Sequence, residues 1–368
     1  MRAMMLLVDS KARRGVQKKS LSAVILFGDL ERWTLFAHDR FQEIVDARIF
    51  SEAIFVVNRD DEETIKAVKK DADSRFSDFP LRVLFHSTNN IPKGRNLGVA
   101  HTEASIIMIW DDDDSCNSQA LRTAFKEIFL PSNFQVLELP LSHEDGSPFH
   151  PQPSNIMPQV PHPQRDDLVV VGMVHTPFLV ARELLLWIPF PECMALRGEW
   201  LHWSTELWRV GIPIVCMKGI VAFECRPHLG IGENASAKAN SFSYYHLLVS
   251  LLHMFARYDI DPESEHCEVI RKRYLDKYHP SDAETVWHAL AEIGSHIRNG
   301  TKVSVEDVLC MDDSFRELLG NAYRRIAECV LVCKNSRPKA RYDVGPFEIF
   351  SPDREKELQE ILRILNVL

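Results

Sequence analysis

Short apolar runs alternate with amphipathic stretches along the first two thirds of the chain. The apolar runs are rich in Val, Ile and Phe and are too short for helices, which favours buried strands. The expected strands cover residues 23–27, 53–57, 81–85, 105–110, 168–173, 212–217 and 220–223. The stretches between them repeat apolar residues at helical spacing, as in residues 33–47. This alternation predicts an α/β fold with a mainly parallel sheet flanked by helices, whose ligands bind beyond the carboxyl ends of the strands.

The pattern changes twice farther along the chain. Residues 140–163 hold seven prolines and little apolar periodicity, which predicts a long loop, either an active-site cover or a disordered segment. Beyond about residue 240 only helical patterns remain, at residues 242–257, 262–278, 281–299, 304–334 and 352–368. We therefore expect a basic flexible tail at 1–20, an α/β domain at 21–238 and a helical domain at 239–368. The helical domain would pack on the sheet domain or form an oligomer contact.

Charge and composition limit the classes of partner. The 368 residues carry 52 acidic and 43 basic side chains, a formal net charge of −9, which argues against nucleic-acid binding. One basic run stands out near the amino terminus, at Lys11, Arg13, Arg14, Lys18 and Lys19. It either touches an anionic membrane surface or forms a solvated tail. Without a signal peptide or the ~20 apolar residues that span a bilayer, we expect a cytoplasmic protein.

The strand expected at 105–110 ends in four consecutive carboxylates, Asp111 to Asp114. Like charges on adjacent residues repel one another, and a divalent cation with a phosphate ligand would relieve the repulsion. If the chain stays extended, Asp111 and Asp113 point to one side of it while Asp112 and Asp114 point to the other. This strand end is the first candidate for a functional site.

The segment before that strand strengthens the candidate. Residues 93–98 read Lys-Gly-Arg-Asn-Leu-Gly and start a short helix, which the acidic-ended strand then follows. This order resembles the nucleotide-sugar-binding half of the GT-A glycosyltransferases, especially family 2, whose members carry Arg-Asn-x-Gly and then Asp-x-Asp. The resemblance covers about residues 22–230. It implies a Rossmann-like GT-A fold and transfer of a sugar from a nucleoside-diphosphate sugar to an acceptor hydroxyl, a hexosyltransferase-like activity of class EC 2.4.

The resemblance assigns roles to the acidic run. It implies that Asp111 contacts the ribose or the base, with Asp112 in the same nucleotide-binding set. Asp113 would bind Mg²⁺ or Mn²⁺ bridging the donor diphosphate, because hard cations prefer carboxylate and phosphate oxygens. Asp114 is the alternate metal ligand, because four aspartates leave the register of the motif open by one residue.

Further donor-site residues come from neighbouring segments. Arg95 and Asn96 stand at a helix start, where free N–H groups and the helix dipole favour a diphosphate. Arg95 could instead simply pair with the aspartates. Asn58 and Asp60 follow the second strand, where members of the family place an acid that reads the base; a plain polar turn is the other reading. His228 follows the last strand and either completes the metal shell, as in some members, or is structural.

On the acceptor side, a transfer with inversion needs a carboxylate that takes the proton of the attacking hydroxyl. Family members carry an acidic pair at a helix start with a glycine about twelve residues later, and Glu199 to Gly211 has that separation. The second acid of the pair is Trp200 here. Three options follow: Glu199 acts alone, Glu206 substitutes from the same helix, or the enzyme is not an ordinary inverting one.

Two other functions remain open at this point. A sugar nucleotidyltransferase would need a glycine-rich phosphate loop with Arg and Lys after the first strand, where residues 27–31 are acidic instead. A non-catalytic nucleotide-sugar-binding or scaffolding protein could keep the donor site and lack the base. For the enzyme, the expected acceptor is a small molecule, a glycan or a lipid-linked sugar, and a homo-oligomer is one way to use the helical region.

Overall fold

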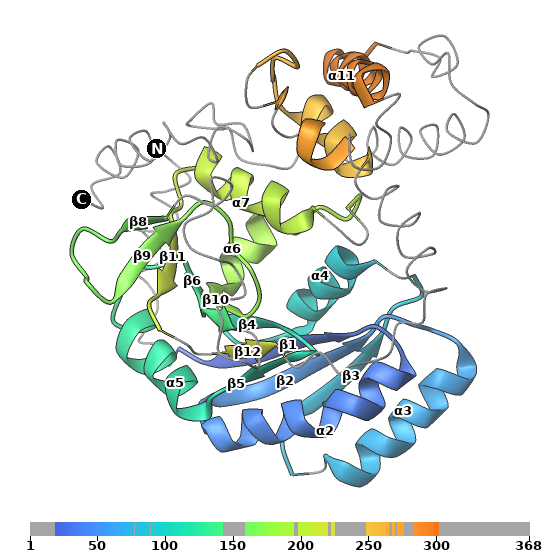
Figure 1. The fold of residues 1–368 in the computed structure, drawn as a ribbon. Helices are drawn as coiled ribbons and strands as arrows, with labels where there is room; N and C mark the ends of the chain where they lie inside the picture. Colours follow the sequence, from blue (N-terminus) through green and yellow to red (C-terminus); the bar gives the residue numbers. More distant parts are fainter. Residues whose placement is uncertain are drawn as a thin grey trace.

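The computed structural model describes residues 19–301 except 77, 89, 143–158, 195–197, 220–221, 225–247, 265–266, 269–270 and 276–282. Its centre is a nine-stranded sheet (Figure 1). In spatial order the strands are β3 (Leu81–Phe85), β2 (Phe50–Val57), β1 (Leu21–Phe27), β4 (Ile106–Asp111), β10 (Phe178–Ala181), β6 (Val136–Glu138), β11 (Ile214–Met217), β9 (Leu168–Val171) and β8 (Gln159–Pro161). Within this sheet, β10 and β9 alone run against the common direction. The predicted α/β class with a mainly parallel sheet is confirmed.

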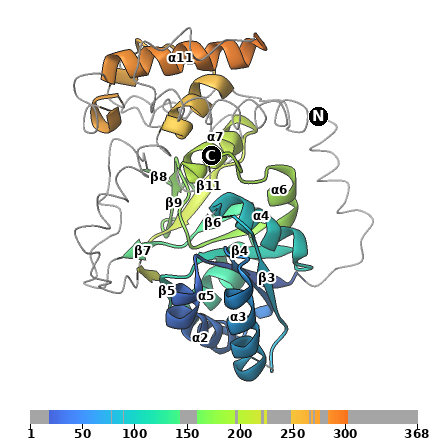
Figure 2. The same ribbon diagram turned by 90° about the vertical axis from the view of Figure 1, so that its right-hand side faces the viewer.

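Helices cover both faces of the sheet, as the apolar strands require. One face packs against α2 (Leu30–Ala47), α3 (Glu62–Arg75), α5 (Ser118–Thr123) and η2 (Ala124–Phe129). The other face packs against α4 (Ile91–His101), α6 (Arg182–Trp187) and α7 (Glu199–Arg209). Figure 2 shows α2 and α3 below the sheet and α4 and α6 beside it. Central strands buried on both sides explain why they are nearly continuous apolar runs.

The predicted strands of the first half are present, with the ends shifted by a few residues. The strand β6 and the element pair β10 and α6 were not assigned from the pattern, because their apolar runs are short. The expected loop at 140–163 begins and ends in strands, β7 (Leu141–Ser142) and β8, so a loop over the whole range is wrong. Residues 143–158 lie outside the described part. A second, small sheet joins β7 with β5 (Asp114–Cys116) through β12 (Ala222–Glu224).

Two glycines let α4 lie close to the sheet. A Cβ at Gly94 would come within 2.6 Å of Leu26 Cδ1, and one at Gly98 within 2.4 Å of Val24 Cγ1. Both distances are far below van der Waals contact, so a larger residue would require a shift of the helix or of the Leu26 and Val24 side chains. The two positions are one helical turn apart and share one face of α4. The close approach fixes the position of Arg95, which lies between the two glycines and contacts Asp111.

The helical region has a hydrophobic core of its own. Its described parts are a helix at 248–257, η3 (Arg271–Leu275) and α11 (Ala283–Asn299). Phe255, Trp287 and Leu290 are buried together in it, and Leu201 of α7 packs against the same cluster. No helix in the described ranges is long and apolar enough to cross a membrane. The tail at 1–18 and the helices expected beyond 302 lie outside these ranges, so the three-part division stays a prediction.

Candidate active site

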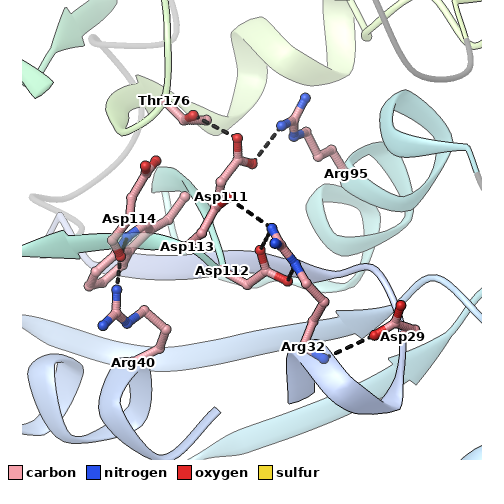
Figure 3. A network of polar contacts seen from close by, with 10 residues as sticks. Asp29, Arg32, Arg40, Arg95, Asp111, Asp112, Asp113, Asp114 and Thr176 are labelled. Carbon is pink, nitrogen blue, oxygen red and sulfur yellow. Dashed lines mark hydrogen bonds and ion pairs between the residues drawn. The ribbon is translucent and has the colours of Figure 1, made fainter. Parts of the chain in front are cut away.

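The acidic run lies at the carboxyl edge of the sheet and does not stay extended. Strand β4 ends at Asp111, the chain turns at 112–113, and Asp114 already belongs to β5. The expected alternation of the four side chains is therefore wrong, because the turn brings Asp112 and Asp113 to the same guanidinium, that of Arg32. Figure 3 shows three arginines around the run, Arg32 and Arg40 from α2 and Arg95 from α4. Each of the first three carboxylates is paired with one of them.

Arg32, in the first turn of α2, holds two of the aspartates. Its Nε donates to Asp112 Oδ2 at 2.9 Å and its Nη2 to Asp112 Oδ1 at 2.5 Å. The same Nη2 lies 2.9 Å from Asp113 Oδ2. Burial raises the pKa of Asp112 to about 7 in spite of this arginine. Burial opposes the charge of Arg32, yet the hydrogen bonds and charges of Asp112 and Asp113 raise its pKa overall.

Arg95, on α4, joins the acidic run to α7. Its Nη2 donates to Asp111 Oδ1 at 2.6 Å, and its Nη1 donates to Glu199 Oε1 at 3.1 Å. The guanidinium carbon lies 4.0 Å from the centre of the Trp200 ring, a cation–π contact. Arg95 and Glu199 are buried, and burial raises the pKa of Glu199 while Arg95 opposes the rise. The structure thus shows the alternative in which Arg95 pairs with an aspartate.

The two ends of the run differ in exposure. Asp111 keeps 30% of its side chain exposed, and its Oδ2 accepts a hydrogen bond from Thr176 Oγ1 at 2.8 Å. Asp113 keeps 21%. Asp114 is buried, and its backbone oxygen accepts hydrogen bonds from Trp110 Nε1 and from Arg40 Nη1. The carboxylates open to solvent are therefore those of Asp111 and Asp113.

The other predicted donor residues lie around this centre in different settings. Asn58 is buried at the end of β2, and its Oδ1 accepts from the backbone N–H of Asn90 at 3.4 Å. Asp60 is exposed. Asn96 exchanges two hydrogen bonds with the backbone of Phe190, at 3.0 and 3.1 Å, so it fastens that segment to α4. Its side chain is thereby engaged away from the aspartates.

Glu206 lies on α7 two turns after Glu199 and has other partners. Its carboxylate accepts hydrogen bonds from Arg257 Nε at 3.0 Å and Nη2 at 3.1 Å, and from the hydroxyl of Tyr258 at 3.3 Å. Both partners belong to the helical region. The structure therefore does not join Glu206 to the cluster of Asp111, Arg95 and Glu199. His228 lies outside the described residues.

A divalent cation is chemically compatible with the acidic run. Asp111 and Asp113 supply oxygen donors that are open to solvent, and Mg²⁺ is commonly held by one or two carboxylates plus substrate phosphates. Among the described residues no group of three or more His, Cys, Asp or Glu side chains could hold a metal alone. The residues fit a cation whose remaining ligands come from a diphosphate.

Three participants were missed from the sequence. Arg32 follows the first strand, and the rule that ligands collect at carboxyl strand ends could have pointed to it. Thr176 lies in a loop without a motif, and its contact with Asp111 has no sequence signal. Trp200 was noted from the sequence only as the residue in place of the second acid. It is half-buried, it makes edge contacts with Phe178 and Phe190, and the guanidinium of Arg95 lies over its face.

Comparison with known proteins identifies the class. The fold is that of residues 1–349 of TarS from S. aureus in complex with UDP-GlcNAc, with a TM-score of 0.50 and 15% identity over 84% of this chain and 89% of that one. A mannosyltransferase, PcManGT from Pyrobaculum calidifontis in complex with GDP-Man and Mn²⁺, overlaps at a TM-score of 0.44 and 10% identity, over 90% and 93%. The architecture is that of a GT-A glycosyltransferase.

The family follows from the sequence match. Residues 43–186 match the family model described as "Glycosyl transferase family 2". This range contains the Arg95 helix and the acidic run. No curated protein sequence matches the chain. Residues 43–186 are therefore similar to a glycosyltransferase family 2 domain, and this match supports a glycosyltransferase, as the motifs at 93–98 and 111–114 predicted.

Proposed function

We propose that the protein moves a sugar from a nucleoside-diphosphate sugar to an acceptor hydroxyl, with Mg²⁺ or Mn²⁺ at the acidic run. The observation that carries this proposal is the pairing of Asp111 with Arg95 inside the matched family 2 range. It puts the Asp-x-Asp carboxylates and the helix-start arginine at one edge of the sheet. The neighbour TarS, crystallised with UDP-GlcNAc, supports a nucleotide-sugar donor.

The donor would lie along the carboxyl edge of the sheet. Asp111 would face the ribose or base, and Asn58 and Asp60 at the end of β2 would lie toward the base. Asp113, open to solvent, would be the metal ligand; Asp114 is too deeply buried to replace it without a shift of β5. When bound, the cation neutralises charge on the departing nucleoside diphosphate. Asp113 would then exchange its contact with Arg32 for the cation.

The acceptor would be deprotonated by Glu199 in an inverting transfer. Glu199 is held at the start of α7 by Arg95, and burial raises the pKa of its carboxyl, which is the direction that improves a general base. Trp200 in place of a second acid leaves Glu199 as the acid of the pair. Glu206 is engaged by Arg257 and is the weaker candidate.

The first experiment is a donor panel. Incubation with Mn²⁺ and each common nucleotide sugar should release nucleoside diphosphate slowly through hydrolysis. Release of pyrophosphate would instead favour a nucleotidyltransferase, and binding without turnover a non-catalytic protein. Asp113→Ala should lose both metal-dependent donor binding and turnover, while Asp71→Ala on α3 should keep both. An Asp113→Ala enzyme that binds and turns over normally would refute the assignment.

A further inference from the structure

Arg32 holds the acidic run in a way that leaves part of its guanidinium unused. Nε and Nη2 contact both oxygens of Asp112, and Nη2 also contacts Asp113. Within the part of the chain that the structure describes, Nη1 donates no hydrogen bond, and 30% of the side chain is exposed. A planar guanidinium with one edge fixed and another nitrogen open is suited to phosphate oxygens.

The two carboxylates that hold Arg32 are not equivalent. Asp112 is buried, with 3% of its side chain exposed, and binds the guanidinium through two parallel hydrogen bonds. Asp113 makes a single contact and is open to solvent. A competing cation would therefore remove Asp113 from Arg32 and leave the bidentate pair with Asp112 intact. Loss of the Asp113 contact would free one N–H of Nη2 in addition to those of Nη1.

The anchor of Arg32 is rigid. Asp29 caps α2, where its Oδ1 accepts the backbone N–H of Arg32 at 2.9 Å, and the guanidinium carbon lies 5.5 Å from the ring of Phe36. Figure 3 shows the side chain rising from the start of α2 to the turn that carries Asp112 and Asp113. Arg32 precedes residue 43, where the family match begins. It is thus a feature of this chain outside the matched family segment.

We propose that Arg32 is a diphosphate-binding residue of the donor site that occupies Asp113 until a divalent cation takes that carboxylate. The guanidinium pairs with Asp113 in the structure, where it would compete with the metal. With the metal at Asp113, Asp112 keeps Arg32 beside it, and Nη1 and Nη2 donate to oxygens of the nucleoside diphosphate. The inference rests on the proposed function, because it assigns a residue to the donor site.

The proposal predicts changes of opposite sign for two ligands. Arg32→Gln removes the competitor of the cation, so Mn²⁺ alone should bind about threefold to tenfold more tightly. The same variant lacks the charged donor to phosphate, so UDP or GDP in saturating Mn²⁺ should bind about tenfold to hundredfold more weakly. A merely structural loss would weaken both. Calorimetric titration of the full chain measures both affinities.

Two further variants make the result decisive. Arg32→Lys keeps the positive charge without the bidentate geometry of the guanidinium. Its affinity for UDP or GDP should lie between those of the parent and Arg32→Gln. Arg75→Gln, which removes an exposed ion pair with Asp71 on α3, is the matched control and should change neither affinity. Thermal melts check that each variant is folded; if Arg32→Gln is not, Arg32→Lys carries the test.

The outcomes separate this inference from the proposed function. If the parent protein binds neither UDP nor GDP with Mn²⁺, nor any other nucleoside diphosphate, the donor site itself is refuted. If the parent binds one of them and folded Arg32→Gln binds it equally well, Arg32 does not contact the diphosphate. Weaker binding of Mn²⁺ alone by Arg32→Gln would show that the arginine supports the cation rather than competing with it.

Discussion

Helix α7 carries two glutamates two turns apart, each buried and each paired with an arginine, yet their surroundings differ. Glu206 takes both hydrogen bonds of the Arg257 fork together with the Tyr258 hydroxyl, inside the packing with the helical region. Glu199 has a single 3.1 Å hydrogen bond from Arg95, whose other nitrogen serves the partly exposed Asp111. The pair at Glu206 is closed, whereas the pair at Glu199 is shared with the site.

Under the proposed function, the difference separates a structural ion pair at Glu206 from a catalytic one at Glu199. A closed bidentate pair stabilises the contact between two parts of a chain, and its carboxylate is fully engaged by its own partners. In a shared pair the arginine neutralises each carboxylate less completely. The pKa of Glu199 is therefore raised by burial in spite of Arg95. The same residue types on one helix can therefore have unlike roles, and substitutions at each should affect unlike quantities.

The largest effect is expected at the shared pair. Glu199→Gln keeps the size of the side chain and a hydrogen-bonding oxygen for Arg95, but it cannot accept the acceptor's proton. The transfer rate should fall about 10²-fold to 10⁴-fold with donor affinity within about twofold of the parent. Steady-state transfer and nucleotide titration measure the two quantities. Transfer at the parental rate would remove Glu199 as the base.

The closed pair should respond in stability. Glu206→Ala leaves Arg257 partly buried without its carboxylate, and the free energy of unfolding should fall by about 3–5 kcal/mol. Chemical denaturation measures it. Glu62→Ala, which breaks an exposed pair with Lys66, is the control and should change stability by no more than about 0.5 kcal/mol. If the two substitutions change stability equally, the Glu206–Arg257 pair does not stabilise the packing of α7 against the helical region.

A smaller effect is expected from the ring under Arg95. Trp200→Leu removes the cation–π contact that holds the guanidinium between Asp111 and Glu199, and kcat should fall about tenfold. Trp200→Phe keeps an aromatic face and should restore most of the loss. If the leucine and phenylalanine variants are equally slow, Trp200 acts through packing with Phe178 and Phe190 instead.

The smallest effect concerns Glu138, at the end of β6. Burial raises the pKa of its carboxyl from 4.5 to about 8, and its Oε2 accepts the backbone N–H of His175 at 3.1 Å. The folded state therefore holds a proton that the unfolded chain releases, and its stabilising effect is lost as the pH rises from about 4.5 through about 8. Glu138→Gln should flatten the fall in melting temperature between about pH 6 and 8. Parallel pH profiles would contradict this.

The sequence was most informative where local chemistry and topology coincide. The alternation of apolar runs predicted β1 to β4 and their helices. The acidic end of β4 and the Arg95 helix pointed to the candidate site, where the structure brings Asp111 and Arg95 together. Periodicity could not reveal that Glu199 and Glu206 of α7 are buried, because their partners Arg95 and Arg257 lie far from them in the sequence. Only the fold brings them together.

The details of the acidic run were also beyond the pattern. A run of four aspartates has no internal signal for where the strand ends, and the turn at 112–113 decides which carboxylates share Arg32. Thr176 comes from a distant loop whose contact with Asp111 depends on the insertion of β10 beside β4. The four adjacent carboxylates predicted that positive charge is needed beside them. In the structure, Arg32 and Arg95 provide it.

The sharing of Arg95 between Asp111 and Glu199 has a thermodynamic consequence for the two substrates. A ligand that neutralises Asp111 leaves Arg95 more fully to Glu199, which lowers the proton affinity of that carboxylate. Under the proposed function, linkage makes the effect reciprocal, so a donor that contacts Asp111 and an acceptor hydroxyl at Glu199 would change each other's affinity by the same factor. One guanidinium would therefore couple the binding of the two substrates.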